Sequence, residues 1–187
     1  MNDLELGKRF ITGGEPELEE VISSYGAKLL RYATSILRNY HDAEDAVQQA
    51  FLLAYQNRTK FDGQNLSAWL HKITYNHSIN KLKKHKVVFF SNFKSIPEES
   101  VNPYEEMSAS DQTLQMLGLI KAEDRALLYG RIIDGQSYDE LAQILGKSPA
   151  ALRKQYERAK NKLATQLSTK PGFLERSPQN EYRYEQA

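Results

Sequence analysis

The chain has 187 residues, of which 40% are hydrophobic and 26% charged, and its formal net charge is +1. These proportions are typical of one ordinary globular domain or two small ones, and they exclude an intrinsically disordered chain. The absence of cysteine excludes a disulfide scaffold, a zinc finger and a cysteine nucleophile. Neither a signal peptide nor a membrane-spanning apolar run is visible, so we expect a cytoplasmic protein with no membrane span.

The near-zero net charge hides two basic stretches that an acidic stretch separates. Residues 71–86 contain five lysines and no acid, and residues 146–163 contain six basic residues against one glutamate. The net charge is −5 over residues 87–124 and −3 over residues 1–70. Basic runs are often solvated helix faces, but two separate runs indicate two places that meet a polyanion.

Three helices are expected in the first half of the chain. Apolar residues at helical spacing predict one helix over residues 17–37 and another over residues 42–56, with Asp42 as the N-cap of the second. A turn at residues 61–63 precedes a third helix over residues 67–84. We therefore predict an N-terminal helical bundle that occupies residues 1–86.

Residues 87–110 lose helical periodicity and gather proline, serine and glutamate, which predicts a flexible interdomain linker. A second helical domain is expected over residues 111–170, followed by a polar tail over residues 171–187. The predicted fold class is all-α, with two small helical domains: an N-terminal helical bundle and a C-terminal helix-turn-helix.

Residues 137–167 carry the sharpest local pattern. Ser137 and Glu140 form a capping box, and Gly146 ends the short helix that follows. Ser148 and Pro149 then begin a longer helix. This spacing predicts a helix-turn-helix, although basic helical hairpins also occur in proteins that bind no nucleic acid. The outer face of the longer helix carries the candidate DNA contacts Arg153, Lys154, Glu157, Arg158 and Asn161.

Two further helix faces suggest contacts with partners. Leu52 and Tyr55 lie opposite the apolar stripe of the predicted helix 42–56, among acids and glutamines, which indicates a contact surface. The third predicted helix carries asparagines and lysines beside aromatic residues, a combination that suits single-stranded DNA. We expect Trp69 to be a core aromatic, whereas for Tyr75 a core role and a DNA-contacting role stay open.

These segments resemble bacterial RNA polymerase sigma factors. Residues 42–51 (DAEDAVQQAF) resemble the polymerase-gripping signature of that family, and residues 68–76 (AWLHKITYN) look like the next segment of the same domain. Residues 137–146 through 158–160 are similar to the family's helix-turn-helix. The short, two-domain organisation is that of the extracytoplasmic-function (ECF) group.

The resemblance implies partners and site residues. The implied partners are core RNA polymerase, through its β′ clamp helices, promoter DNA and an anti-sigma factor. Residues 153–161 of the outer face fall on the helix that recognises the minus-thirty-five element. The expected polymerase-binding residues are Asp42, Glu44, Asp45, Gln48, Gln49, Phe51, Leu52 and Tyr55. The residues expected to recognise and open the minus-ten element are Lys72, Tyr75, Asn76, Asn80, Lys83 and Lys84.

Some positions depart from the family pattern. The family usually has Glu at the position of Gln49, often Asp at that of Asn80, and Arg where Lys83 and Lys84 stand. Lysine lacks the planar fork of arginine, so base contacts here are expected to differ. These departures bear on which promoter sequence is recognised and not on the class of function.

Two alternatives compete with this interpretation. A helix-turn-helix regulator that does not bind polymerase would explain residues 137–167 but not residues 42–51. An enzyme is disfavoured because the four histidines show no metal-ligand spacing and no phosphate loop or nucleophile elbow is present. We therefore expect no catalytic residue, no metal site and no cofactor.

Overall fold

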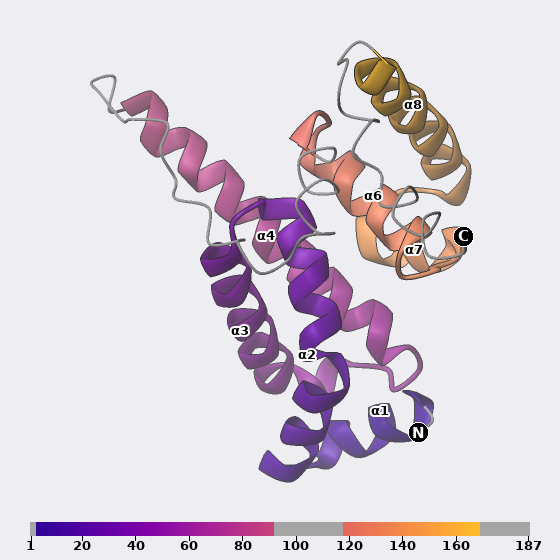
Figure 1. The fold of residues 1–187 in the computed structure, drawn as a ribbon. Coiled ribbons are helices and arrows are strands. Elements are labelled where there is room, and N and C mark those ends of the chain that lie inside the picture. The colour runs from indigo at the N-terminus through magenta and orange to yellow at the C-terminus, as the bar shows by residue number, and fades with distance from the viewer. Residues whose placement is uncertain (1–2, 92–117, 169–187) are drawn as a thin grey trace, which may run out of the picture.

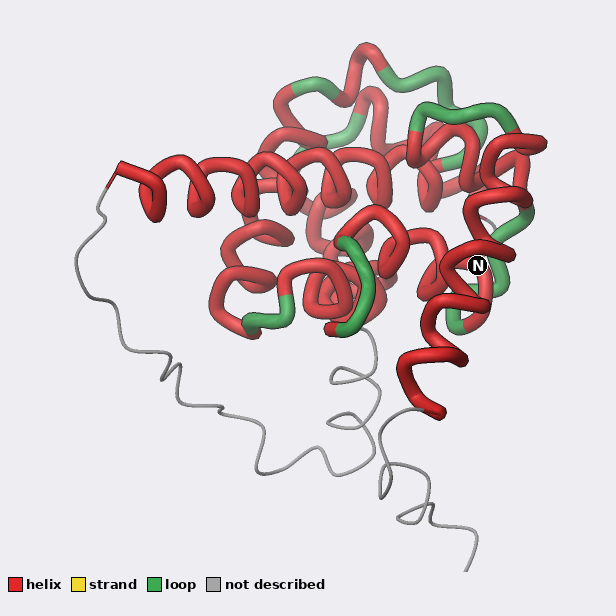
Figure 2. The backbone as a smooth tube through the Cα atoms, turned by 90° about the horizontal axis from the view of Figure 1, so that it is seen from above, coloured by secondary structure: helices red, strands yellow, loops and turns green. Residues whose placement is uncertain are grey.

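The computed structural model describes residues 3–91 and 118–168. Its described residues form α-helices and one short 3₁₀ helix, η1 (Arg58–Lys60), and contain no strand (Figure 2). The helices are α1 (Asp3–Thr12), α2 (Glu15–Leu37), α3 (Tyr40–Gln56), α4 (Leu66–Ser91), α6 (Ala122–Ile132), α7 (Tyr138–Leu145) and α8 (Pro149–Ser168). The all-α prediction with two helical domains is confirmed.

The N-terminal domain is a bundle of α1–α4 around an apolar core. Helices α2, α3 and α4 pack on one another, and α1 lies across the base of the bundle (Figure 1). The apolar stripe predicted for α3 is buried, from Ala43 to Ala54. Helix α1 was not predicted, yet its Leu6 and Phe10, one helical turn apart, are buried in the same core.

Two predicted element boundaries in this domain were wrong. The N-cap of α3 is Asn39 rather than Asp42, and the Asn39 side chain accepts a hydrogen bond of 2.9 Å from the Asp42 backbone N–H. Asp42 therefore lies inside the first turn, where the helix dipole favours an acid. Helix α4 continues to Ser91, past the predicted helix end at residue 84. The rest of the predicted linker, and the tail, lie outside the described residues.

The C-terminal domain contains the predicted helix-turn-helix. The Ser137 side chain accepts from the Glu140 N–H at 3.1 Å, and the Glu140 carboxylate accepts from the Ser137 N–H at 2.8 Å. Gly146 ends α7 with a left-handed φ of 67°, and Ser148 caps the start of α8. The residues between 137 and 149 thus turn the chain as the sequence predicted.

The two domains pack against each other. Helix α7 lies on α4, and α6 lies on the end of α2 (Figure 1). One apolar cluster joins Tyr32 and Ile36 of α2 and Ile79 of α4 to Leu128 and Tyr129 of α6. This packing between the domains places the helix-turn-helix on one side of α4.

Candidate polymerase and nucleic-acid interfaces

The outer face of α3 presents an apolar residue among polar ones. Gln48 and Gln49 are exposed, and Leu52 is 48% exposed with no packing role in the core. Tyr55 is half-buried, with the Arg58 guanidinium 4.2 Å from its ring centroid. Phe51 is 6% exposed and belongs to the core, so its contribution is to hold the face in place.

The acidic start of α3 is joined to the basic helix α4 by Lys81. The Lys81 ammonium lies 2.8 Å from an Asp42 carboxylate oxygen and 3.0 Å from one of Asp45. Burial opposes its charge, but the hydrogen bonds to Asp42 and Asp45 outweigh burial and raise the pKa of Lys81. Glu44, also predicted to meet polymerase, has His41 at 3.8 Å on the same helix. One lysine of the basic stretch 71–86 therefore pairs with acids of its own domain.

An exposed polar strip runs along α4. Its members recur at intervals of three or four residues, with two adjacent lysines at its end, so they gather on one side of the helix. Tyr75 differs from the other predicted DNA contacts, because it is half-buried against the apolar cluster between the domains. The exposed residues of the strip are Lys72, Asn76, Asn80, Lys83 and Lys84.

Two hollows flank this strip and share Trp69 as a wall. The first, of about 350 Å³, lies between α3 and α4 and is lined by Leu53, Asn76, His77 and Asn80 among others. Burial, and then Lys81 and Lys84, lower the pKa of His77. A histidine that stays neutral can both donate and accept a hydrogen bond, as recognition of a base edge requires.

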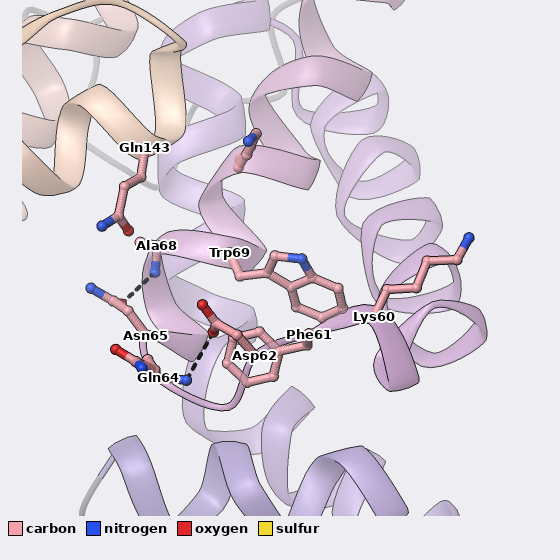
Figure 3. Close-up of a pocket in the computed structure, with 9 residues that line it drawn as sticks. Lys60, Phe61, Asp62, Gln64, Asn65, Ala68, Trp69 and Gln143 are labelled. Carbon is pink, nitrogen blue, oxygen red and sulfur yellow. Dashed lines mark hydrogen bonds between the residues drawn. The ribbon is translucent and has the colours of Figure 1, made fainter.

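The second hollow, of about 500 Å³, lies beside the loop that leads into α4 (Figure 3). Phe61 and Trp69 stack in it, with ring centroids 4.9 Å apart and planes inclined by 26°. Lys60 and Lys72 supply positive charge at its edge. Gln143 of α7, in the other domain, also lines it. We call it the Phe61–Trp69 pocket.

The outer face of α8 is exposed at every residue predicted to contact DNA, from Arg153 to Asn161. The Tyr138 ring positions Arg153, whose guanidinium carbon lies 5.1 Å from the ring centroid. Glu157 pairs with Lys160 at 3.4 Å. The face therefore offers arginines and lysines held on a rigid helix, which is suited to a duplex groove.

Sequence reasoning missed the polar residues between the domains. Arg125, Asp134 and His71 are buried there, and Gln143 reaches the Phe61–Trp69 pocket. No local periodicity marks such residues, since their partners are more than 60 positions away. The one signal in the sequence was His71, a histidine at a position where the helical spacing of α4 predicts a buried side chain.

Among the described residues, no group of three or more His, Cys, Asp or Glu side chains is placed to hold a metal ion. No helix in the described part of the chain combines the length and hydropathy needed to cross a membrane.

Comparison with known proteins identifies both halves of the chain. Two family models match, Sigma-70 region 2 over residues 21–87 and Sigma-70, region 4 over residues 110–163. The ECF RNA polymerase sigma factor SigW of Bacillus subtilis is 25% identical over a 176-residue alignment that covers 86% of this chain and 94% of SigW. SigE of Mycolicibacterium smegmatis, also an ECF RNA polymerase sigma factor, is 24% identical over 82% of this chain, and the match spans 62% of SigE.

The fold is similar to that of a solved sigma factor. The structure of RpoE in complex with the anti-sigma factor NepR, from Bartonella quintana, superposes with a TM-score of 0.67 at 25% sequence identity. The likeness covers 81% of this chain and 96% of RpoE.

Proposed function

The chain belongs to the sigma-70 family, in its ECF group, and from this premise we propose how its surfaces divide the work of starting transcription. A sigma factor binds core RNA polymerase and directs it to promoters, and this is the function of the chain. The observation that supports this assignment of surfaces is the pair of ion pairs from Lys81 to Asp42 and Asp45. They hold the outer face of α3 beside the polar strip of α4.

The outer face of α3 is the proposed polymerase-binding surface, with the β′ clamp helices as its partner. Leu52 is the central apolar contact, because it is 48% exposed and lies outside both apolar clusters of the described residues. Gln48, Gln49 and Tyr55 surround it, and Phe51 supports it from the core. Asp42, Glu44 and Asp45 give the start of the face its negative charge.

The polar strip of α4 is the proposed site for the opened minus-ten element. Its lysines meet phosphates, whereas Asn76 and Asn80 offer both a donor and an acceptor to unpaired bases. The two hollows beside Trp69 are large enough to take bases that leave the stack, and the half-buried Trp69 ring, stacked on buried Phe61, offers an aromatic surface. Melting and sequence recognition thus occur on one helix.

The outer face of α8 is the proposed site for the duplex minus-thirty-five element. Arg153 and Arg158 can form paired hydrogen bonds to guanine in the major groove, and Lys154 can neutralise a phosphate. Since RpoE is bound to an anti-sigma factor in its structure, we also propose such a partner for this chain. A cytoplasmic location follows from contact with polymerase and DNA.

The test is reconstitution with core RNA polymerase. The purified protein is expected to bind core enzyme and to yield promoter-specific run-off transcripts from genomic templates. Leu52→Glu is expected to weaken core binding by about tenfold or more, because it places a charge at the centre of the contact. Ile22→Glu is the matched control, since Ile22 is 42% exposed on a different helix.

Two results would contradict the proposal. If the wild-type chain binds promoter duplex tightly but never associates with core enzyme, it is a regulator of another kind. If Ile22→Glu weakens core binding as much as Leu52→Glu does, the outer face of α3 is not the specific contact.

A further inference from the structure

We propose that α1 sets the shape of the Phe61–Trp69 pocket from behind, and that Gly7 is the positioning residue through which it acts. The inference rests on the proposed function, because it concerns how this pocket takes an unpaired base of the minus-ten element. Helix α1 has no part in the surfaces assigned above, yet it packs against the loop that forms the pocket.

Gly7 allows the Phe61 ring to lie against the backbone of α1. A Cβ atom on Gly7 would stand 3.1 Å from Cε1 of Phe61 and 3.4 Å from the Gly63 carbonyl oxygen. The first of these distances is shorter than the optimal separation of two carbon atoms, about 3.5 Å or more. A side chain at residue 7 would therefore push the Phe61 ring away from α1.

Phe61 transmits this contact to Trp69. The Phe61 side chain is buried, lines the pocket and stacks on the Trp69 ring (Figure 3). Trp69 in turn lines both hollows beside the polar strip of α4. Because protein interiors are close-packed, a displaced Phe61 ring has to move Trp69 or the loop with it. The surface on which a base would stack therefore depends on the space that Gly7 leaves.

The middle of the loop approaches α1 through a second glycine. Gly63 has a positive φ of 78°, and a Cβ atom there would come within 3.2 Å of Cδ1 of Ile11. A side chain on Gly63 would therefore be strained by its backbone and would also meet α1. Glycines on both sides of the contact, Gly7 on the helix and Gly63 on the loop, allow a close approach.

Both ends of the loop are tied to α1 or to the turn that follows it. At its start, the Arg58 side chain donates through Nε to the Gly13 carbonyl at 3.2 Å. At its far end, the Asp3 carboxylate accepts from the Leu66 backbone N–H at 3.2 Å and from the Tyr25 hydroxyl. Asp3 stands at the amino end of α4, where the helix dipole favours an acid. These contacts hold α1 beside the first turn of the helix that carries the polar strip.

The shape of the pocket should matter most where the promoter has to be opened. A base that leaves a duplex loses its pairing and stacking, and binding in the pocket has to offset that cost. A template that is already unpaired over the minus-ten element carries no such cost. A defect in the pocket should therefore lower transcription from duplex more than transcription from a pre-opened template.

The first experiment compares two glycine-to-valine variants in reconstituted polymerase holoenzyme. Gly7→Val places methyl groups against Phe61. Gly26→Val on α2 is the matched control, because the nearest atom that a Cβ on Gly26 would meet is Cγ2 of Ile22, at 3.9 Å. Run-off transcripts are measured from one promoter as a duplex and as a copy unpaired over the minus-ten element.

The ratio of duplex to pre-opened transcripts is expected to fall about fivefold or more in Gly7→Val, the lower end of what stacking of one base on a ring contributes. The ratio should stay unchanged in Gly26→Val. Affinity for core enzyme should equal that of the wild type in both variants, because neither changes the outer face of α3.

The second experiment uses the single tryptophan of the chain as a probe. Trp69 is the only tryptophan, so tryptophan fluorescence of the free, full-length protein reports on the pocket. Gly7→Val is expected to change the emission maximum and the quenching by acrylamide, whereas Gly26→Val should change neither. Circular dichroism checks that Gly7→Val folds; if it does not, Gly7→Ala, which adds one methyl group at the same point, decides.

The proposal is overturned if the two glycine variants give the same ratio of duplex to pre-opened transcripts, or if Trp69 emission in Gly7→Val is that of the wild type. It is also overturned if Gly7→Val loses affinity for core enzyme, because α1 would then act on the domain as a whole. Failure of the proposed function looks different: the wild-type chain itself would not bind core enzyme or yield promoter-specific transcripts.

Discussion

The two basic stretches of the chain, residues 71–86 and 146–163, have the same net charge of +5 but different structural settings. On α4, Lys81 is held by Asp42 and Asp45, and the remaining lysines border two hollows and an aromatic stack. On α8, the predicted DNA contacts from Arg153 to Asn161 are all exposed, and Arg153 lies against the Tyr138 ring. A single-strand site needs hollows and aromatic rings, whereas a duplex site needs a projecting helix. The charge count alone could not tell these sites apart.

The largest expected effect tests whether α8 recognises promoter bases or only supplies positive charge. Arg158→Ala should lower transcription from promoters that depend on the minus-thirty-five element by about ten- to a hundredfold, because a base-reading arginine is worth about 1–3 kcal/mol. Lys162→Ala removes the same charge from the side of the helix and should have a much smaller effect. Run-off transcription measures both, and equal losses would mean that α8 contributes only charge.

The next effect tests whether the strip of α4 meets phosphates. Lys83→Ala should weaken binding of an opened promoter and reduce the slope of log K against log salt by about 0.7, the value for one single-strand phosphate contact. Affinity is measured in the polymerase complex at several salt concentrations. An unchanged slope would place Lys83 away from the DNA.

Lys81 should behave differently from its neighbour Lys83. Lys81→Met should destabilise the N-terminal domain by about 1 kcal/mol, because it leaves Asp42 and Asp45 facing each other without their cation. The salt slope of DNA binding should not change. Urea unfolding gives the stability, and a reduced slope in this variant would show that Lys81 also contacts phosphate.

The smallest effect concerns His77, which lines the hollow between α3 and α4. Burial and the charges of Lys81 and Lys84 lower its pKa, so Lys84→Ala should raise that pKa toward the ordinary value. As pH falls, the wild-type imidazole should therefore stay neutral to lower pH than in the variant. Nuclear magnetic resonance titration of the ring follows this, and identical curves would exclude the influence of Lys84.

Local sequence signals predicted most of the fold. The apolar stripe of α3 and the Ser137–Glu140 capping box involve residues a few positions apart, so periodicity and cap chemistry reveal them. The same logic missed α1, which has two core residues and few repeats of its pattern. It also chose Asp42 as a cap, because aspartate and asparagine are equally good caps and only the backbone shows which one precedes the first turn.

The candidate sites were less accessible to sequence reasoning. Exposure of Leu52 could be inferred from its place opposite an apolar stripe, and the structure agrees. The burial of Tyr75 could not, since it depends on a domain that lies 47 or more positions further along the chain. The sequence does not distinguish Lys81 from the other basic residues, because its ion pairs depend on the packing of α3 beside α4. Long-range packing, which local patterns do not encode, decided these cases.

Arg125 of α6 donates to the Ile36 carbonyl at the carboxyl end of α2, and this contact has a consequence for how the molecule unfolds. The carboxyl end of α2 is completed by a side chain from the other domain, so the two halves share part of their free energy of folding. Thermal unfolding should then be more cooperative than two independent transitions. A fragment that ends at residue 91 would expose Tyr32 and Ile36 and leave that helix end frayed, which makes it prone to self-association. Cutting the chain between its domains would therefore change each half.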